Sequence, residues 1–326
     1  AIIILNRYLR DFLNDLMNEL ELINKIKKLL PQNETVIAGI GEDCAVIDLK
    51  HSEYWLLFKT DAIVEGIHFI SGTESEKVGH KAIARCLSDI AAMGGKPISA
   101  LITIGLPKDF SPEYVEGIYN GMSKVANRYS VAIVGGETTT NPERILISVS
   151  MLGVVEKEKC VFRSGAKPGD AIFVTGELGG SIEQKHLEFE PRIKEAHWLV
   201  NNFKPSAMID LSDGLASDLR HITIEQGLGA ELLASAIPIS DVAKKRSRIN
   251  PSSKPALTAA LTDGEDFELL FTINPKVAVD LLDKWKKAFP DLKLCCIGKV
   301  TDTVGFKIRT KNGIFDVTEY GYIHFA

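Results

Sequence analysis

Several features are missing from this chain of 326 residues, and each absence removes a class of protein. No apolar run approaches the roughly 20 residues that a membrane-spanning helix needs. The apolar run at residues 1–5 is too short for the core of a signal peptide and leads into Asn6 and Arg7. The five cysteines contain no C-x-x-C pair, which argues against a disulfide framework or a structural zinc site. Together these absences favour a protein of the reducing cytoplasm.

An excess of positive charge is also missing. Lysine and arginine number 38 and aspartate and glutamate 43, which gives a net charge of −5. A mildly acidic chain is a poor candidate for non-specific binding to nucleic acid or to an anionic membrane. What remains, 45% hydrophobic and 25% charged residues, is typical of a globular protein. We therefore expect neither nucleic acid nor a membrane as a partner.

The common nucleotide and hydrolase motifs are absent as well. The stretch Gly94-Gly95-Lys96-Pro97 has proline where a P-loop needs serine or threonine, and no G-x-G-x-x-G opens a helix after a strand. There is no H-E-x-x-H and no G-x-S-x-G, which excludes zincin peptidases and ordinary serine hydrolases. Any nucleotide site in this chain must be built in another way.

The hydrophobic pattern predicts a mixed α and β fold in two halves. In the first half we expect strands at residues 36–40, 45–49, 54–60, 98–106, 131–134 and 145–155, and helices at 77–93 and from Ser111 onward. In the second half we expect strands at 171–175, 207–211, 267–273 and 293–300, helices at 213–222 and 277–289, and a hairpin turning at Asn312-Gly313. Met17 reads like a natural start. The expected units are therefore an extension at 1–16, an N-terminal domain at 17–157 and a C-terminal domain at 158–326.

Acidic residues recur where predicted strands and helices end. They are Asp43, Asp61, Asp89, Glu137, Asp210, Asp213, Asp263, Glu265 and Asp266. Carboxylates placed among apolar residues need compensation, because burying an unpaired charge is costly. Lysine and arginine are not interleaved at matching positions, so internal ion pairs are not the obvious partners. Mg²⁺ prefers carboxylate oxygens and retains substrate phosphates as further ligands, so the recurrence favours metal-bound phosphate.

A plainer interpretation exists for each acid taken alone. An aspartate beside glycine is most often a turn or cap residue, and Asp213 has the position to cap the helix predicted at 213–222. Asp43 fits a solvated turn, and residues 263–266 fit a charged loop. Asp89 is less easily explained, because it falls in the last turn of its helix, where the helix dipole disfavours an anion by roughly 0.3–1 kcal/mol. A nearby cation would remove that objection.

Nine segments in order carry a family resemblance. They are residues 39–47, 60–69, 87–95, 135–139, 163–170, 174–176, 209–219, 263–270 and 321–325. Together they resemble the thiamine-monophosphate kinase family, which is grouped with aminoimidazole ribonucleotide synthetase, selenophosphate synthetase and a hydrogenase maturation factor. The T-D-x-x-V-E-G-x-H-F pattern at 60–69 and the closing G-Y-x-H-F favour the kinase over its relatives.

The resemblance implies transfer of the γ-phosphoryl group of ATP to thiamine monophosphate, with several Mg²⁺ ions. It also implies an α+β fold, in which an N-terminal mixed four-stranded sheet forms a barrel with that of a second subunit in a homodimer. By motif position, the implied metal-binding residues are Asp43, Lys59, Thr60, Asp61, Asp89, Glu137, Asp210 and Asp213. The implied ATP contacts are Tyr119, Gly136, Glu137, Arg163 and Ser212, and the implied substrate contacts are His68, Glu265, Asp266 and Tyr322. The residues expected to carry catalysis are Asp89, Arg163 and Asp213.

Four positions depart from the family pattern. Glu42 and Glu137 stand where aspartate is common, and the longer arm of Glu137 shifts any bound metal or the backbone that carries it. The ammonium group of Lys59 competes with a cation, and Asp263 replaces a usual glycine and adds charge. Two alternatives therefore stand beside the kinase: a related ATP-dependent synthetase that acts on another acceptor, and a catalytically silent nucleotide-binding protein.

Overall fold

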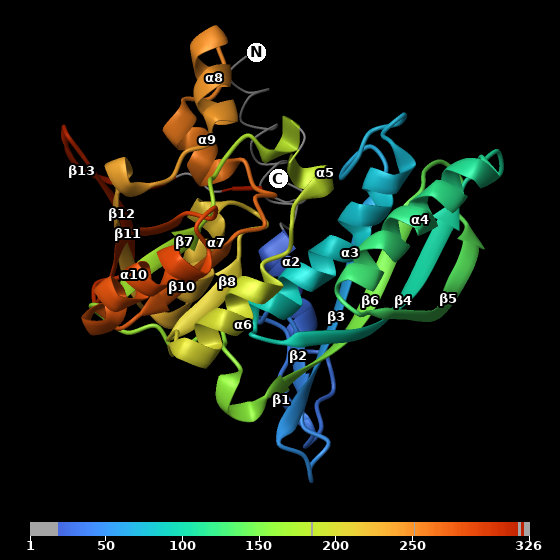
Figure 1. The fold of residues 1–326 in the computed structure, drawn as a ribbon, viewed down its shortest axis with the longest axis horizontal. Helices are drawn as coiled ribbons and strands as arrows, with labels where there is room; N and C mark the ends of the chain where they lie inside the picture. Colours follow the sequence, from blue (N-terminus) through green and yellow to red (C-terminus); the bar gives the residue numbers. More distant parts are fainter. Residues whose placement is uncertain (1–18, 184, 251, 319–320, 323–326) are drawn as a thin grey trace, which may run out of the picture.

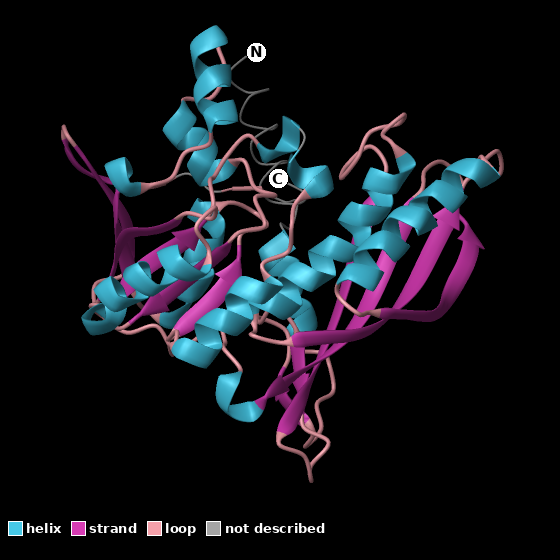
Figure 2. Cartoon of the chain, in the orientation of Figure 1, coloured by secondary structure: helices cyan, strands magenta, loops and turns pink. Residues whose placement is uncertain are grey.

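Two β-sheets, with helices packed between and around them, form the chain in this computed structural model (Figures 1 and 2). The structure describes residues 19–183, 185–250, 252–318 and 321–322. The expected extension at 1–16 and the last residues of the closing motif, 323–325, lie outside this range. The fold is α+β, as the sequence predicted.

The N-terminal sheet has the strand order β1-β2-β3-β6-β4-β5. Its strands are β1 (Val36–Ala38), β2 (Ala45–Ile47), β3 (Tyr54–Val64), β4 (Lys96–Leu106), β5 (Ala132–Thr140) and β6 (Leu146–Glu156). The pair β4–β5 is parallel and the other pairs are antiparallel, so the sheet is mixed. The expectation of four strands was incomplete, because the short β1 and β2 extend the four long strands to a sheet of six.

Helices α3 (Ser75–Ala92) and α4 (Pro112–Arg128) pack together beside this sheet and cover one of its faces (Figure 1). The α4 helix begins as its sequence predicts, with the Ser111 hydroxyl accepting a hydrogen bond from the Tyr114 amide at 3.1 Å. On α3 the apolar stripe of Ile83, Leu87 and Ile90 is fully buried. The α3 helix also contacts α5, α6 and β8 of the C-terminal half, so it lies where the two halves meet.

The other face of the N-terminal sheet is exposed. Phe58, Leu101 and Val134 keep 48%, 47% and 64% of their surface accessible. They lie on β3, β4 and β5, so the exposed apolar side chains extend across the sheet. A large exposed apolar patch on a globular protein is typical of an interaction surface.

The C-terminal sheet has the strand order β13-β12-β9-β11-β7-β10-β8. Its strands are β7 (Ala171–Thr175), β8 (Ala207–Asp210), β9 (Gly229–Leu233), β10 (Leu269–Ile273), β11 (Leu294–Thr301), β12 (Gly305–Thr310) and β13 (Gly313–Asp316). The helices of this half are α5 (Lys185–Glu188), α6 (Ile193–Asn202), α7 (Leu215–Ile222), α8 (Asp241–Ile249), α9 (Ala256–Thr262) and α10 (Ala278–Ala288), and α2 (Glu19–Lys27) precedes β1. The predicted hairpin is present, with β12 paired to β13 across Thr310 and Gly313.

The structure differs from the predicted elements in two places. Strand β5 continues to Thr140 through Gly135 and Gly136, whose φ angles of 152° and 155° suit glycine, instead of ending at residue 134. The polar stretch before β8 and the region after α7 hold α6, β9, α8 and α9, which the pattern did not predict. None of the described helices is long and apolar enough to cross a membrane.

Candidate active site

Three carboxylates from distant parts of the chain meet beside the C-terminal end of α3. Asp43 precedes β2, Asp89 lies in the last turn of α3 and Asp210 ends β8. Each offers an oxygen within 4.8 Å of the others, and all three residues are buried. We call Asp43, Asp89 and Asp210 the carboxylate cluster.

The cluster is electrostatically strained. Burial and the negative charge of Asp43 raise the pKa of Asp210 to about 6, although the hydroxyl of Ser88 donates to it at 2.6 Å. Burial raises the pKa of Asp89 well above its usual range. The Oδ2 atom of Asp43 is buried with no hydrogen-bond partner. An unpartnered oxygen among carboxylates that resist ionisation fits a site for a hard divalent cation.

Cations of the protein also reach these acids, which corrects the expectation that internal ion pairs are not the obvious partners. Lys59 lies 2.7 Å from Asp89 and pairs with it, and the Nε atom of Arg163 donates to Asp43 at 3.1 Å. Asp61, which follows Lys59 by two residues on β3, accepts from Arg85 of α3 at 3.0 Å. These pairs compensate part of the charge and leave Asp43 Oδ2 unpaired.

A cavity of about 310 Å³ lies between α2 and α7, and it is linked to the cluster by Arg163, which lines the cavity and donates to Asp43. Its wall includes Arg163, Ser212, Asp213, Asp218 and Tyr322. Asp213 does not cap α7: the cap position is Gly214 (φ 107°), and the Asp218 carboxylate accepts from the amides of Asp213 and Gly214 at 3.1 and 3.0 Å. We call this the larger cavity.

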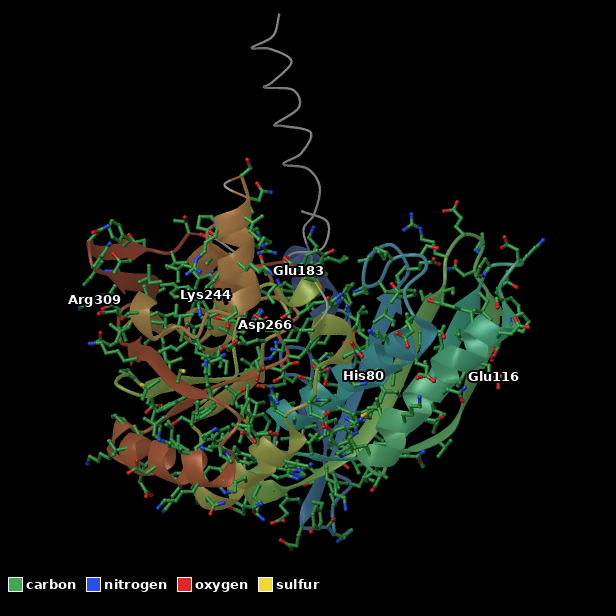
Figure 3. The ribbon with its side chains drawn as sticks, turned by 45° about the horizontal axis from the view of Figure 1, so that its top comes forward. His80, Glu116, Glu183, Lys244, Asp266 and Arg309 are labelled. Carbon is green, nitrogen blue, oxygen red and sulfur yellow. The ribbon has the colours of Figure 1, made fainter. Side chains whose placement is uncertain are left out.

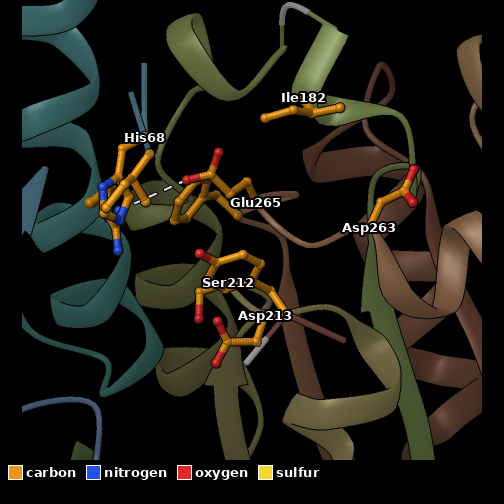
Figure 4. Close-up of a pocket in the computed structure, with 10 residues that line it drawn as sticks. His68, Ile182, Ser212, Asp213, Asp263 and Glu265 are labelled. Carbon is orange, nitrogen blue, oxygen red and sulfur yellow. Dashed lines mark ion pairs between the residues drawn. The ribbon is translucent and has the colours of Figure 1, made fainter. Parts of the chain in front are cut away.

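A second cavity adjoins it on the side of the 60–69 segment (Figure 4). Its lining residues are Ile67, His68, Arg85, Ile182, Ser212, Asp213, Asp263, Glu265, Phe267 and Tyr322. We call this the smaller cavity. Ser212, Asp213 and Tyr322 line both cavities, so the two spaces meet at these residues.

Glu265 is held at the wall of the smaller cavity by groups that sequence reasoning missed. Its backbone has a φ angle of 54°, unusual for a residue with a side chain. Its Oε2 atom lies 2.7 Å from Nζ of the fully buried Lys81 and 3.0 Å from Nδ1 of His186. Burial alone raises the pKa of Glu265, but the hydrogen bond from His186 and the charge of Lys81 bring it to about 2. Glu265 is therefore an anion at neutral pH.

His68, another expected substrate contact in this cavity, is electrically neutral. Burial and the nearby positive charge of Arg85 lower the pKa of His68 to about 4. Its Nδ1 atom accepts a hydrogen bond from the amide of Val64 at 3.1 Å, which fixes the ring at the end of β3.

Some predicted site residues lie elsewhere. Asp266 lines neither cavity, because both of its oxygens accept from the Gly179 amide at 3.0 Å, inside the C-terminal half (Figure 3). Thr60 contacts Ser150 at 3.2 Å on the exposed face of the N-terminal sheet. Tyr119, on α4, packs against the hydrophobic core that lies under the N-terminal sheet.

Glu137 and Gly136 are also remote from the carboxylate cluster within one chain. The register pairs Glu137 with Thr103, which pairs with Ser148, which pairs with Ala62. Glu137 therefore lies three strand spacings from β3, roughly 14 Å. Paired side chains share a face, so Glu137 points to the side opposite Asp61.

Comparisons with known proteins agree with this architecture. The family model described as AIR synthase related protein, N-terminal domain, matches residues 41–155. The hydrogenase maturation protein HypE of E. coli shares the fold at 19% identity, with a TM-score of 0.68 over 91% of this chain and 96% of that one. Residues 41–155 thus match the N-terminal domain of AIR synthase related proteins, and the fold as a whole is shared with a more distant protein.

Closer similarity defines the family. The thiamine-monophosphate kinase of Rhodopirellula baltica is 38% identical over 303 residues, which cover 90% of this chain and 92% of that protein. The solved structure of AaThiL complexed with AMPPCP and TMP is 32% identical, with a TM-score of 0.79 over 94% of this chain and 97% of that one. The chain belongs to the thiamine-monophosphate kinase family.

Proposed function

We infer that this protein is an ATP-dependent kinase that phosphorylates thiamine monophosphate to thiamine diphosphate. One observation carries the inference: two cavities meet at Ser212, Asp213 and Tyr322, beside buried carboxylates. Transfer between two phosphates needs such adjoining sites, since donor and acceptor must lie in line. The relative of known structure binds AMPPCP, an ATP analogue, together with TMP.

We assign ATP to the larger cavity and thiamine monophosphate to the smaller one. Arg163 offers the larger cavity a guanidinium for phosphate oxygens. His68, Glu265 and Tyr322 line the smaller cavity. The acceptor phosphate is largely ionised at neutral pH, because its second pKa is about 6, so no strong general base is required. The main task of the residues in the two cavities is to hold the γ-phosphate of ATP and the phosphate of thiamine monophosphate next to each other.

Asp43, Asp89 and Asp210 would hold Mg²⁺, with Asp61 and Asp213 as further ligands toward the two cavities. Magnesium would supply charge neutralisation for the phosphates that approach each other. The unpartnered Asp43 Oδ2 atom and the raised pKa values of Asp89 and Asp210 support this assignment. Lys59 holds one oxygen of Asp89 and adds a fixed positive charge at the edge of the cluster.

We propose that the protein acts as a homodimer through the exposed face of the N-terminal sheet. A second copy would cover Phe58, Leu101 and Val134, and would bring the partner subunit's Glu137 toward a site that lacks it within one chain. Sedimentation tests this: Leu101→Glu should shift a dimer to a monomer and lower turnover, whereas a wild-type monomer would contradict it. The cytoplasmic location expected from the five cysteines, which form no disulfide, stays a prediction.

The activity is tested by incubating the protein with ATP, Mg²⁺ and thiamine monophosphate and measuring thiamine diphosphate and ADP by chromatography. We expect one ADP for each thiamine diphosphate, and no turnover when EDTA replaces Mg²⁺. Turnover only with an aminated ribotide would indicate a synthetase instead. Bound ATP without any product would indicate a silent nucleotide-binding protein.

A further inference from the structure

Arg85 lies on α3, four residues before Asp89, and no motif in the sequence singled it out. Its side chain reaches the wall of the smaller cavity and keeps 15% of its surface exposed. Its Nε atom donates to Asp61 Oδ2 at 3.0 Å, which fixes one edge of the guanidinium. Arg85 therefore stands between a predicted magnesium ligand and the cavity assigned to the acceptor.

One nitrogen of this guanidinium has no hydrogen-bond partner. The Nη1 atom of Arg85 is buried without a hydrogen bond, and the carboxylate of Glu265 is 3.8 Å away, beyond hydrogen-bond range (dashed line in Figure 4). Leaving a buried charged donor unsatisfied costs more than leaving a neutral one. Such an atom at a cavity wall suggests that a ligand satisfies it.

The charge of the smaller cavity indicates which ligand. Asp213, Asp263 and Glu265 bring acidic groups to its lining, and His68 is neutral at pH 7. Among the described residues that line it, Arg85 is the one side chain with a permanent positive charge. Arginine suits phosphate recognition because its planar guanidinium offers several donors at once.

We propose that Arg85 binds the phosphate of the acceptor through Nη1 and neutralises part of its charge as the donor phosphate approaches. The proposal rests on the proposed function and adds a residue to it. Two neighbours hold the guanidinium: Asp61 from one side and Glu265, itself anchored by Lys81, from the other. The competing explanation is that Arg85 only compensates the charge of Asp61.

Binding measured by calorimetry separates the two explanations. Thiamine monophosphate and thiamine are titrated into the wild type, Arg85→Met and Arg85→Lys, in the presence of Mg²⁺. We expect Arg85→Met to weaken the binding of thiamine monophosphate about 10- to 100-fold, the range for a hydrogen bond to a charged group. The binding of thiamine should weaken less than twofold. Arg85→Lys should recover part of the loss. Equal weakening of both ligands, or no weakening of either, would overturn the proposal.

Kinetics and a matched control complete the test. Arg85→Met should raise the KM for thiamine monophosphate and leave the KM for ATP within twofold. Arg128→Met is the control, because Arg128 is an exposed arginine of α4 that pairs with the exposed Glu190. If the wild type binds thiamine monophosphate without phosphorylating it, the proposed function fails. The comparison of binding between the wild type and the Arg85 variants then still tests the role of Arg85. If the wild type turns over and Arg85→Met keeps its KM and its binding, only the role of Arg85 fails.

Discussion

The carboxylate cluster and Glu268 are both buried, but their surroundings are opposite. The cluster joins Asp43, Asp89 and Asp210, which crowd one another and keep one oxygen without any hydrogen-bond partner. Glu268, which follows α9 in the C-terminal half, is at least as buried. Its carboxylate meets two cations: it pairs with Lys185 at 2.8 Å and with Arg192 at 2.7 Å.

The pKa values show the consequence. Burial alone raises the pKa of Glu268, but the charges of Lys185 and Arg192 bring it to about 2. In the cluster, burial and the negative charge of Asp43 raise the pKa of Asp210 to about 6. Glu268 therefore stabilises the folded state in its charged form. The ionised carboxylates of the cluster destabilise the folded state unless a bound cation compensates their charge. Burial of an acid does not by itself indicate a ligand site, but several acids crowded around an oxygen without a hydrogen-bond partner do.

The largest effect expected from this contrast is on Asp89. Asp89→Asn removes a predicted magnesium ligand at the centre of the cluster, so kcat should fall by about 10³-fold or more, as when a main electrostatic group of an active site is lost. The change removes a charge that repels the neighbouring carboxylates and also the charged partner of Lys59, so the two effects on stability oppose each other and the Mg²⁺-free protein should melt within a few degrees of wild type. Turnover within tenfold of wild type would remove Asp89 from the metal site.

Glu268 provides the opposite case. Glu268→Gln leaves Lys185 and Arg192 with an uncharged partner. The free energy of unfolding should therefore fall by about 3 kcal/mol, which is typical of breaking a buried ion pair. Urea unfolding measures the change, with Glu225→Gln as the control, since Glu225 pairs with His221 at the surface. Kinetic constants should change far less than in Asp89→Asn. Unchanged stability would show that the contrast between Glu268 and the carboxylate cluster does not extend to the free energy of unfolding.

Local patterns in the sequence predicted much of the fold and the identity of many site residues. The bounds of β7 agree with the prediction, and α3 and α4 lie within two residues of theirs at the predicted ends. These elements carry strong periodicity and clear start signals, such as Ser111 before Pro112. Asp43, Asp89 and Asp210 could be proposed as a group because acids recurred at the ends of elements.

Contacts between distant segments could not be predicted in the same way. The pairs Lys59–Asp89 and Arg163–Asp43 join residues 30 and 120 positions apart, and nothing local specifies them. Lysine side chains are rarely buried, so the pattern offered no reason to expect Lys81 in the core. Lys81 is fully buried on α3, and its contact with Glu265 was therefore missed. Glu137 was grouped with the cluster, but sheet register sets it apart within one chain.

The smallest effect expected is a dependence of magnesium binding on pH. A folded-state pKa of about 6 for Asp210, above the usual value of 3.8, means that the folded protein holds a proton which the unfolded chain has lost. The Mg²⁺-free protein therefore loses stability from this group as pH rises from about 4 through 6. Magnesium binds the ionised form, so its stabilisation should grow over the same range. We expect millimolar Mg²⁺ to raise the melting temperature by a few degrees more at pH 7.5 than at pH 5. Asp210→Asn should abolish most of this difference, and an equal rise at both pH values in the wild type would argue against magnesium at the cluster.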